Sequence, residues 1–349
     1  MNLSLSEDRT MLKDALTRAL AKESTPARIR AAEKAGHDPA LWTVFSEMGL
    51  PLLRVAEDHG GIGLGLLDAV LVAETVGEHL AVIPAVDVMV TARLLSDLGS
   101  DAALALLGQV AEGAVVGLAL HDAAQTPEQL VATAASAQVL VFRQGDEIRA
   151  LAGPLGEVEA NLGAFAARKV TLAGGDLLAA GPEAVRAFEA AIEEWKLLNA
   201  ASIAAAARQA ILNAAEYAKE RQAFGRPIGS YQGLAHPLAE AFAEVDGAAL
   251  LVWRTVEAIG AGRPDAAALV SMAAWWAAKA CQPAVIKAMR VFGGYGMTME
   301  YDAQIFFRRV TALSLLMGDP NLELQKAADR LWGGASVALP DAGEVGISF

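Results

Sequence analysis

The residues best suited to ligand chemistry lie in two glycine-bearing segments in the second half of the 349-residue chain. Gly293, Gly294 and Gly296 would let the backbone approach a phosphate or a ribose without a Cβ in the way. Because they follow an apolar run, they could equally form the end of a helix. Upstream, Arg221 lies three residues before Phe224. Taken alone, these two residues favour a solvated helix end for the arginine and a core position for the phenylalanine.

Composition excludes several other kinds of site. A single cysteine, Cys281, rules out an internal disulfide framework and is expected in the core. Five scattered histidines show none of the paired spacings of a zinc site. The net charge of −13 would repel nucleic acid, although a local basic pocket for a phosphate-bearing cofactor remains compatible with it.

Hydrophobic residues make up 54% of the chain and charged residues only 20%, so we expect apolar surface to be covered by another subunit. The longest uncharged apolar stretch, Ala266 to Ala278, is shorter than the roughly 20 residues that span a bilayer. It predicts a buried helix and no membrane association. The N-terminus lacks the pattern of a signal peptide, so a cytoplasmic location is expected.

Three regions must position the two segments. Residues 1–113 show helical periodicity behind a capping candidate at Ser6, with a glycine-rich loop from His59 to Gly65. Residues 114–181 contain short apolar or alternating runs, and Gly145-Asp146 predicts a hairpin turn. Residues 182–349 return to helical periodicity behind Pro182, with alanine-rich runs suited to close packing and glycine or proline breaks. The order predicts an α+β multidomain fold: a helical domain, a small β-domain and a C-terminal four-helix-type bundle.

The two segments resemble the signatures of the acyl-CoA dehydrogenase family. Residues 217–232, YAKERQAFGRPIGSYQ, are similar to the first signature of its C-terminal domain. Residues 292–301, FGGYGMTMEY, followed by Phe307-Arg308, are similar to the second. A weaker match from Met48 to Glu74 extends the resemblance over nearly the full length. The family has the same helical, β, helical architecture.

The resemblance implies FAD, shared across a subunit interface. In this family the adenosine diphosphate half of FAD lies across a dimer interface, so Arg221 would pair with the pyrophosphate of a cofactor held mainly by the neighbour. Phe224 would pack near the adenosine, and Gly225 would end the helix. Arg290 stands where the family usually has glutamine. The residues that the resemblance assigns to FAD are Arg221, Phe224, Gly225, Gln232, Arg290, Gly293, Gly294 and Gly296.

The residues expected to do the family's chemistry are missing. α,β-Dehydrogenation needs a carboxylate base, usually a glutamate after the second signature, and Met317 occupies that position. Some members keep the base on an earlier helix, where Glu194 lies one residue, or about 100° of rotation, from the matching position. Glu194 is a weak candidate, and the acidic run of Glu189, Glu193 and Glu194 favours a solvated face. Nearby, Asp319 is expected to cap the next helix.

The β-domain is also reduced, because it lacks a counterpart of the family's Trp-Ile-Thr-Asn-Gly stretch beside the flavin. The resemblance therefore implies a degenerate subunit of an α2β2 acyl-CoA dehydrogenase, most like the heterotetrameric enzymes of bacterial steroid side-chain catabolism. A paralogous catalytic subunit, a bulky acyl-CoA and electron-transfer flavoprotein would be its partners. The alternatives are a self-sufficient homotetramer that uses Glu194 or Asp319, and a non-enzymatic CoA-ester-binding or scaffold protein.

Overall fold

The computed structural model describes residues 2–33 and 35–349, and its first part is helical. The Ser6 Oγ accepts a hydrogen bond from the Arg9 N–H at 3.3 Å, which confirms the predicted cap. Two single 3₁₀ turns, at Leu50–Leu52 and Glu57–His59, occupy the approach to the glycine-rich loop. The helices are α1 (Glu7–Glu23), α2 (Pro26–Ala32), α3 (Pro39–Glu47), α4 (Leu66–Glu78), α5 (Ala85–Leu98) and α6 (Asp101–Ala111).

Seven strands follow in two small sheets. The predicted hairpin is confirmed, since β3 and β4 pair antiparallel across a turn in which Gly145 has φ +67°. One sheet has the order β1-β3-β4-β7 and the other β2-β6-β5. The sequence did not predict β2, β5 and β7. The strands are β1 (Val116–Leu118), β2 (Glu128–Val131), β3 (Val139–Gln144), β4 (Glu147–Ala152), β5 (Glu157–Glu159), β6 (Ala167–Thr171) and β7 (Asp176–Ala180).

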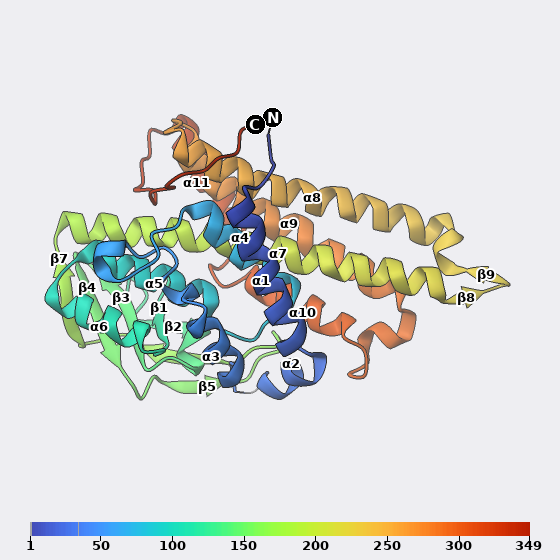
Figure 1. The fold of residues 1–349 in the computed structure, drawn as a ribbon, viewed down its shortest axis with the longest axis horizontal. Coiled ribbons are helices and arrows are strands. Elements are labelled where there is room, and N and C mark those ends of the chain that lie inside the picture. Colours follow the sequence, from blue (N-terminus) through green and yellow to red (C-terminus); the bar gives the residue numbers. More distant parts are fainter. Residues whose placement is uncertain (1, 34) are drawn as a thin grey trace.

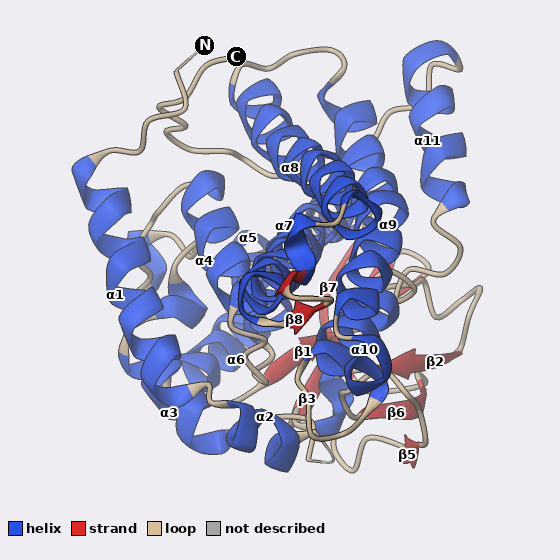
Figure 2. Cartoon of the chain, turned by 90° about the vertical axis from the view of Figure 1, so that its right-hand side faces the viewer, coloured by secondary structure: helices blue, strands red, loops and turns tan. Residues whose placement is uncertain are grey.

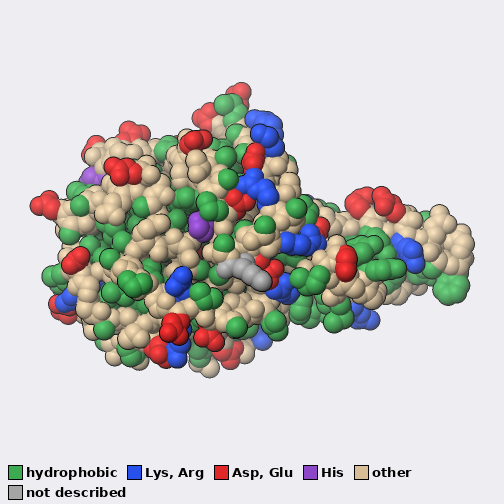
Figure 3. All heavy atoms as spheres, turned by 90° about the horizontal axis from the view of Figure 1, so that it is seen from below, with side chains coloured by type: hydrophobic (Ala, Val, Ile, Leu, Met, Phe, Trp, Pro, Cys, Tyr) green, Lys and Arg blue, Asp and Glu red, His purple; other side chains and the backbone are tan. Residues whose placement is uncertain are grey.

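Long helices then form a projecting arm. Pro182 begins α7 (Pro182–Glu220), whose 39 residues span about 60 Å. In Figure 1, α7 and α8 (Gln232–Gly260) run side by side to a small hairpin, β8 (Gln222–Ala223) and β9 (Arg226–Pro227), at the end of the molecule. Hydrophobic side chains are exposed along this arm (Figure 3). The remaining helices are α9 (Ala266–Val291), α10 (Ala303–Leu313) and α11 (Asn321–Trp332).

Helices α4 and α7 cross at very close range. A Cβ added to Gly77 of α4 would lie 2.2 Å from the carbonyl oxygen of Ser202 on α7. The Ser202 Oγ donates to the carbonyl of Ala73 at 2.9 Å. Viewed along the arm, α7 lies between the N-terminal helices and α9 (Figure 2). The alanine-rich sequence of α7 is therefore explained by close packing on both sides, which confirms the predicted architecture of helices, small sheets and helical bundle.

The C-terminal tail returns to the N-terminus. Asn2 and Ser348 pair through backbone hydrogen bonds of 2.7 and 2.9 Å, and the two ends lie together in Figure 1. The Arg9 guanidinium links Asp68 of α4 to the carbonyls of Glu344 and Val345. The described helices include none long and apolar enough to cross a membrane.

Candidate functional site

The β8–β9 hairpin carries the first group of predicted site residues. Helix α7 ends at Glu220, so Gly225 does not end the helix as the resemblance implied. Instead, Phe224 (φ +53°) and Gly225 (φ +81°) form the two-residue turn of the hairpin. Two consecutive left-handed residues are typical of a type I′ turn, whose geometry matches the twist of the flanking strands.

Phe224 is held in an unusual position. Phe224 is 98% exposed, which excludes the core position that Arg221 and Phe224 taken alone favoured. A bulky residue in the left-handed region costs about 1 to 2 kcal/mol. The turn is held in place because the Tyr231 hydroxyl donates to the Ala223 carbonyl at 2.9 Å and the Arg226 guanidinium lies 4.2 Å from the Tyr231 ring. An exposed aromatic side chain on a strained, well-supported turn is typical of a binding surface.

The second glycine-bearing segment follows α9, and its three glycines differ in backbone conformation and in the space around the Cα. Gly293 has φ +61° directly after the helix end, as the alternative of a helix cap predicted. A Cβ on Gly296 would lie 2.4 Å from the Met289 carbonyl oxygen, so this glycine serves packing. Gly294 has neither a positive φ nor any atom within 4 Å of an added Cβ. Of the three, only Gly294 has neither a positive φ nor a close contact that requires glycine. Its open side therefore leaves room for a molecule outside the chain.

Aromatic side chains join the two segments. Tyr217, on the last turn of α7, stacks on Phe292 at 4.6 Å, and Tyr301 stacks on Tyr295 at 5.3 Å. Tyr217 and Tyr301 also meet edge to face at 6.4 Å. The structure therefore places Tyr217, at the start of the first segment, next to the second segment. Beyond this cluster the predicted cofactor side chains of Arg221, Gln232 and Arg290 are all exposed.

Glu194 lies in a buried ion pair. Its carboxylate oxygens accept from the Arg54 Nε and Nη2 at 3.0 and 3.2 Å, and both side chains are almost fully buried. The predicted solvated face is therefore wrong for Glu194 and also for Glu193, because remote cations cover them. Its neighbours Trp195 and Lys196 line cavities, but Glu194 lines neither. Glu194 therefore faces Arg54 and not the cavities that its two neighbours line.

Met317 lines a small cavity of about 30 Å³ between α7, α9 and the start of α11. The polar side chains on its wall include Lys196 and Glu323, which are ion-paired at 3.2 Å. The N-cap of α11 is Pro320 and not the predicted Asp319, which lies one residue earlier and accepts from the Asn321 N–H at 2.9 Å. A volume of this size holds about one water molecule. The cavity beside Met317 is therefore small, and the Glu323 carboxylate on its wall is already engaged by Lys196.

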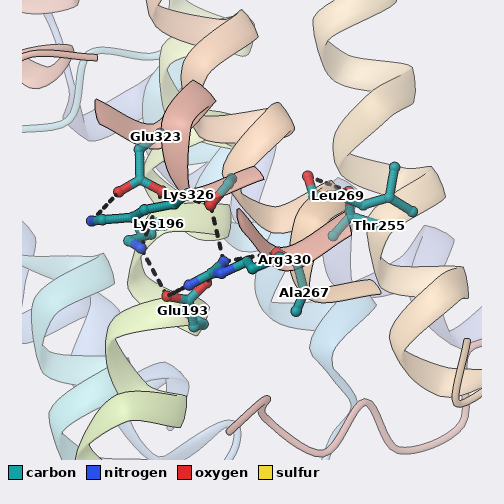
Figure 4. A network of polar contacts seen from close by, with 9 residues as sticks. Glu193, Lys196, Thr255, Ala267, Leu269, Glu323, Lys326 and Arg330 are labelled. Atoms are coloured by element: carbon teal, nitrogen blue, oxygen red, sulfur yellow. Dashed lines mark hydrogen bonds and ion pairs between the residues drawn. The ribbon is translucent and has the colours of Figure 1, made fainter. Parts of the chain in front are cut away.

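Lys196 and Glu323 belong to a larger buried charge network, which Figure 4 shows from close by. Lys196 donates to Glu193 at 2.8 Å, and Arg330 reaches both oxygens of Glu193 at 2.7 and 2.9 Å. Glu323 also accepts from Lys326 at 2.7 Å. Burial alone would raise the pKa of Glu323, but Lys196, Lys326 and a hydrogen bond from a serine hydroxyl outweigh it and lower the pKa. Glu323 is thus held as a carboxylate without a free role in proton transfer.

A larger cavity, which we call the junction cavity, has a volume of about 110 Å³. It is lined by the α4–α5 connection, by Thr133 and Phe165 of the β region, by α7 and by Arg309 of α10. Asp87 accepts from the Trp195 indole N–H at 3.3 Å, and burial raises the pKa of this carboxyl. The sequence analysis missed both Asp87 and Arg309. A charged residue on an apolar helical face, as at Arg309 beside Ile305 and Val310, was the signal for the second.

Among the described residues, no group of histidine, cysteine, aspartate and glutamate could hold a metal ion. The candidate site thus consists of an exposed edge on the arm that carries the residues the resemblance assigns to FAD, a small cavity at Met317 and the junction cavity.

The chain is similar to known proteins in both its N-terminal and its C-terminal region. Residues 6–113 match the model described as acyl-CoA dehydrogenase, N-terminal domain, and residues 185–332 that described as acyl-CoA dehydrogenase, C-terminal domain. The acyl-CoA dehydrogenase IpdE2 of Mycolicibacterium smegmatis is 29% identical over 331 residues, 92% of this chain and 98% of that protein. IpdE2 of Mycobacterium tuberculosis is also 29% identical, over 93% of this chain and 98% of its own length.

Two solved structures share the fold. A variant of the Tcur3481-Tcur3483 steroid ACAD superposes with a TM-score of 0.85 at 24% identity, over 95% of this chain and 99% of the other. A chain of the ChsE4-ChsE5 complex from Mycobacterium tuberculosis gives 0.82 at 22% identity, over 96% and 100%.

Proposed function

Because the chain belongs to the acyl-CoA dehydrogenase family, we propose that it is the non-catalytic subunit of a heteromeric FAD-dependent acyl-CoA dehydrogenase. One observation carries the proposal. Met317, at the position that the resemblance assigns to the family's base, lines a cavity of about 30 Å³ next to a Lys196–Glu323 ion pair. Methionine cannot accept a proton, and a carboxylate committed to two lysines is a poor base at neutral pH.

The residues of the arm fit FAD as a cofactor that they would contact at the surface of this subunit, and not as one enclosed within it. Bound FAD supplies the hydride acceptor of the reaction. Arg221, exposed at the end of α7, would pair with its pyrophosphate, and Phe224 would pack on its adenosine. Gly294 leaves open space for the same approach. These side chains lie at the surface, which supports a cofactor held mainly by a second subunit.

The partner would be a paralogous catalytic subunit in an α2β2 complex. Two solved structures with this fold are named as pairs of proteins, the ChsE4-ChsE5 complex and the Tcur3481-Tcur3483 steroid ACAD. The second of these names contains the word steroid. We infer by analogy a bulky steroid side-chain acyl-CoA as substrate and electron-transfer flavoprotein as electron acceptor, in the cytoplasm. The exposed apolar arm supports association with another subunit.

The test is to purify the chain alone and together with a co-expressed paralogue that has the base, and to measure flavin per subunit and dye-linked acyl-CoA oxidation. Flavin and turnover are expected only in the mixture. Stoichiometric flavin and activity in the chain alone would favour the self-sufficient homotetramer and overturn the proposal. A complex that forms without flavin or turnover would instead favour the scaffold alternative.

Arg221→Ala tests the cofactor-binding edge within that complex. Losing one charge-assisted contact of about 1.5 to 3 kcal/mol should weaken FAD retention roughly 10- to 100-fold. Arg186→Ala, an exposed arginine near the other end of the same helix, is the matched control and should leave flavin content unchanged. Equal flavin content in both variants would remove Arg221 from the site.

A further inference from the structure

Arg309 is a cationic residue on the buried face of α10. Its side chain points with the buried residues of that helix, among them Ile305, Phe306 and Val310, and the residue is only 8% exposed. The preceding residue, Arg308, lies at the helix edge. There it pairs with Glu33 and donates to the Gln304 side chain at 3.1 Å. The helix therefore carries one ordinary paired arginine and one buried one.

The buried arginine has no counter-ion among the described residues. Among the described residues, the Arg309 side chain makes one hydrogen bond, from Nη2 to the Ala164 carbonyl at 2.6 Å, and its Nε has no partner. Burial lowers the pKa of Arg309 to about 10, so the group still carries its charge at neutral pH. An unpaired buried cation is costly, and such groups are normally found where an anion completes them.

The surroundings define the size and chemistry of that anion. Arg309 lines the junction cavity, whose other walls are mostly apolar, including Leu80, Val82, Phe165 and Leu313. A volume of about 110 Å³ is well above the roughly 15 Å³ that one water needs and far below the roughly 300 Å³ of the smallest cofactor pockets.

We propose that the junction cavity binds a short-chain carboxylate of about four to six non-hydrogen atoms, whose carboxylate accepts hydrogen bonds from Arg309 and whose alkyl end packs against the apolar wall. The planar guanidinium matches a carboxylate, and the apolar wall favours a short alkyl end over a fully hydrated inorganic anion. Asp87 also lines this cavity, where its carboxylate accepts from the Trp195 indole N–H and burial raises the pKa of the carboxyl. This site is separate from the cofactor-binding edge and does not depend on the proposed function.

The experiment uses the full chain and two matched probes. Propanoate is titrated by calorimetry and thermal unfolding, with propanamide as the uncharged probe of the same shape and hexanoate as a longer one. Propanoate should bind and raise the unfolding temperature, propanamide should do neither, and hexanoate should bind at least tenfold more weakly. Absence of propanoate binding, or equal binding of propanamide, would overturn the proposal whatever the flavin experiments show.

Variants assign the contact to Arg309. In Arg309→Met the propanoate Kd should rise about 10- to 100-fold, because a charge-assisted pair is lost. Without propanoate this variant should unfold at the same or a higher temperature than the parent chain. Arg308→Gln, which breaks the ordinary pair one residue away, should keep the parent Kd. If Arg309→Met binds propanoate like the parent, the assignment is wrong. If that variant does not fold, the comparison of propanoate with propanamide in the parent chain still decides.

Discussion

Glu194 illustrates how a carboxylate near an expected active site can serve structure alone. It faces Arg54 from 140 residues away in the sequence, and Arg54 also donates to the carbonyls of Leu64 and Asp341. The pair thereby connects α7 to the N-terminal region and to the C-terminal tail. A base that must take up a proton during turnover would have to give up a two-point contact with a buried guanidinium.

We predict that Glu194→Gln lowers the free energy of unfolding by about 3 to 5 kcal/mol, because it leaves the buried Arg54 charge uncompensated. Denaturant unfolding of the isolated chain measures this. The double variant Arg54→Met/Glu194→Leu should lose less than the sum of the two single variants. If Glu194→Gln is as stable as the parent chain but stops turnover in the complex, Glu194 is the base and our interpretation fails.

At the scale of elements, the buried network of Glu193, Lys196, Glu323 and Arg330 joins α7, α9 and α11. Arg330 also donates to Ser271 at 2.9 Å, and Ser271 donates to Glu323 at 2.8 Å. These helices form the wall around Met317. The side chains that would surround a catalytic carboxylate therefore fix three helices instead.

This network predicts an acid-dependent loss of stability. Glu323 has a pKa below its ordinary 4.5 in the folded chain, so its pairing contributes fully above pH 4.5 and is lost as the pH falls through the lower folded value. Glu323→Gln should cost about 1.5 to 3 kcal/mol at neutral pH and flatten the fall in unfolding free energy below pH 4.5. Unfolding measured from pH 7 to pH 3 tests this, and an unchanged slope would count against it.

The crossing of α4 and α7 gives a second prediction for elements. Gly77→Ala should destabilise the chain by about 2 kcal/mol or more, because its Cβ would lie 2.2 Å from the Ser202 carbonyl oxygen and push two long helices apart. Gly108→Ala is the matched control, since it also lies within a helix but its Cβ meets nothing within 4 Å. It should stabilise by about 0.5 to 1 kcal/mol. Equal effects of the two substitutions would show that the crossing can relax.

Local features of this fold could be predicted from the sequence, whereas remote pairings could not. Ser6, Pro182 and Gly145 act on the backbone within a few residues of themselves, so the helix starts and the hairpin were predictable. The burial of Glu193 and Glu194 depends on Arg330 and Arg54, 137 and 140 residues away. No local pattern carries that information. The left-handed backbone of Phe224 was not predicted, because a phenylalanine in that conformation contradicts local preference, which is also why it is informative.

For the whole molecule, the arm leaves an apolar groove of about 510 Å³ between α7 and α8. Its walls include Leu212, Leu234 and Phe242, and it lies on the arm that ends in the β8–β9 hairpin. An apolar groove of this size on a chain with 54% hydrophobic residues supports the proposed association with a second subunit. The groove and the proposed cofactor-binding edge would then belong to one interface.

We therefore predict that Ala239→Glu, which places a charge on the exposed wall of this groove, prevents assembly with the catalytic paralogue and so removes flavin from both subunits. Because Ala239 is exposed and helical, the unfolding free energy of the isolated chain should change by no more than about 0.5 kcal/mol. Light scattering after gel filtration measures assembly, and Ala102→Glu, an exposed site in the first turn of α6, is the control that should still assemble. A complete, flavin-loaded complex of Ala239→Glu would show that the groove faces solvent and that the shared cofactor must be reached from another side of the arm.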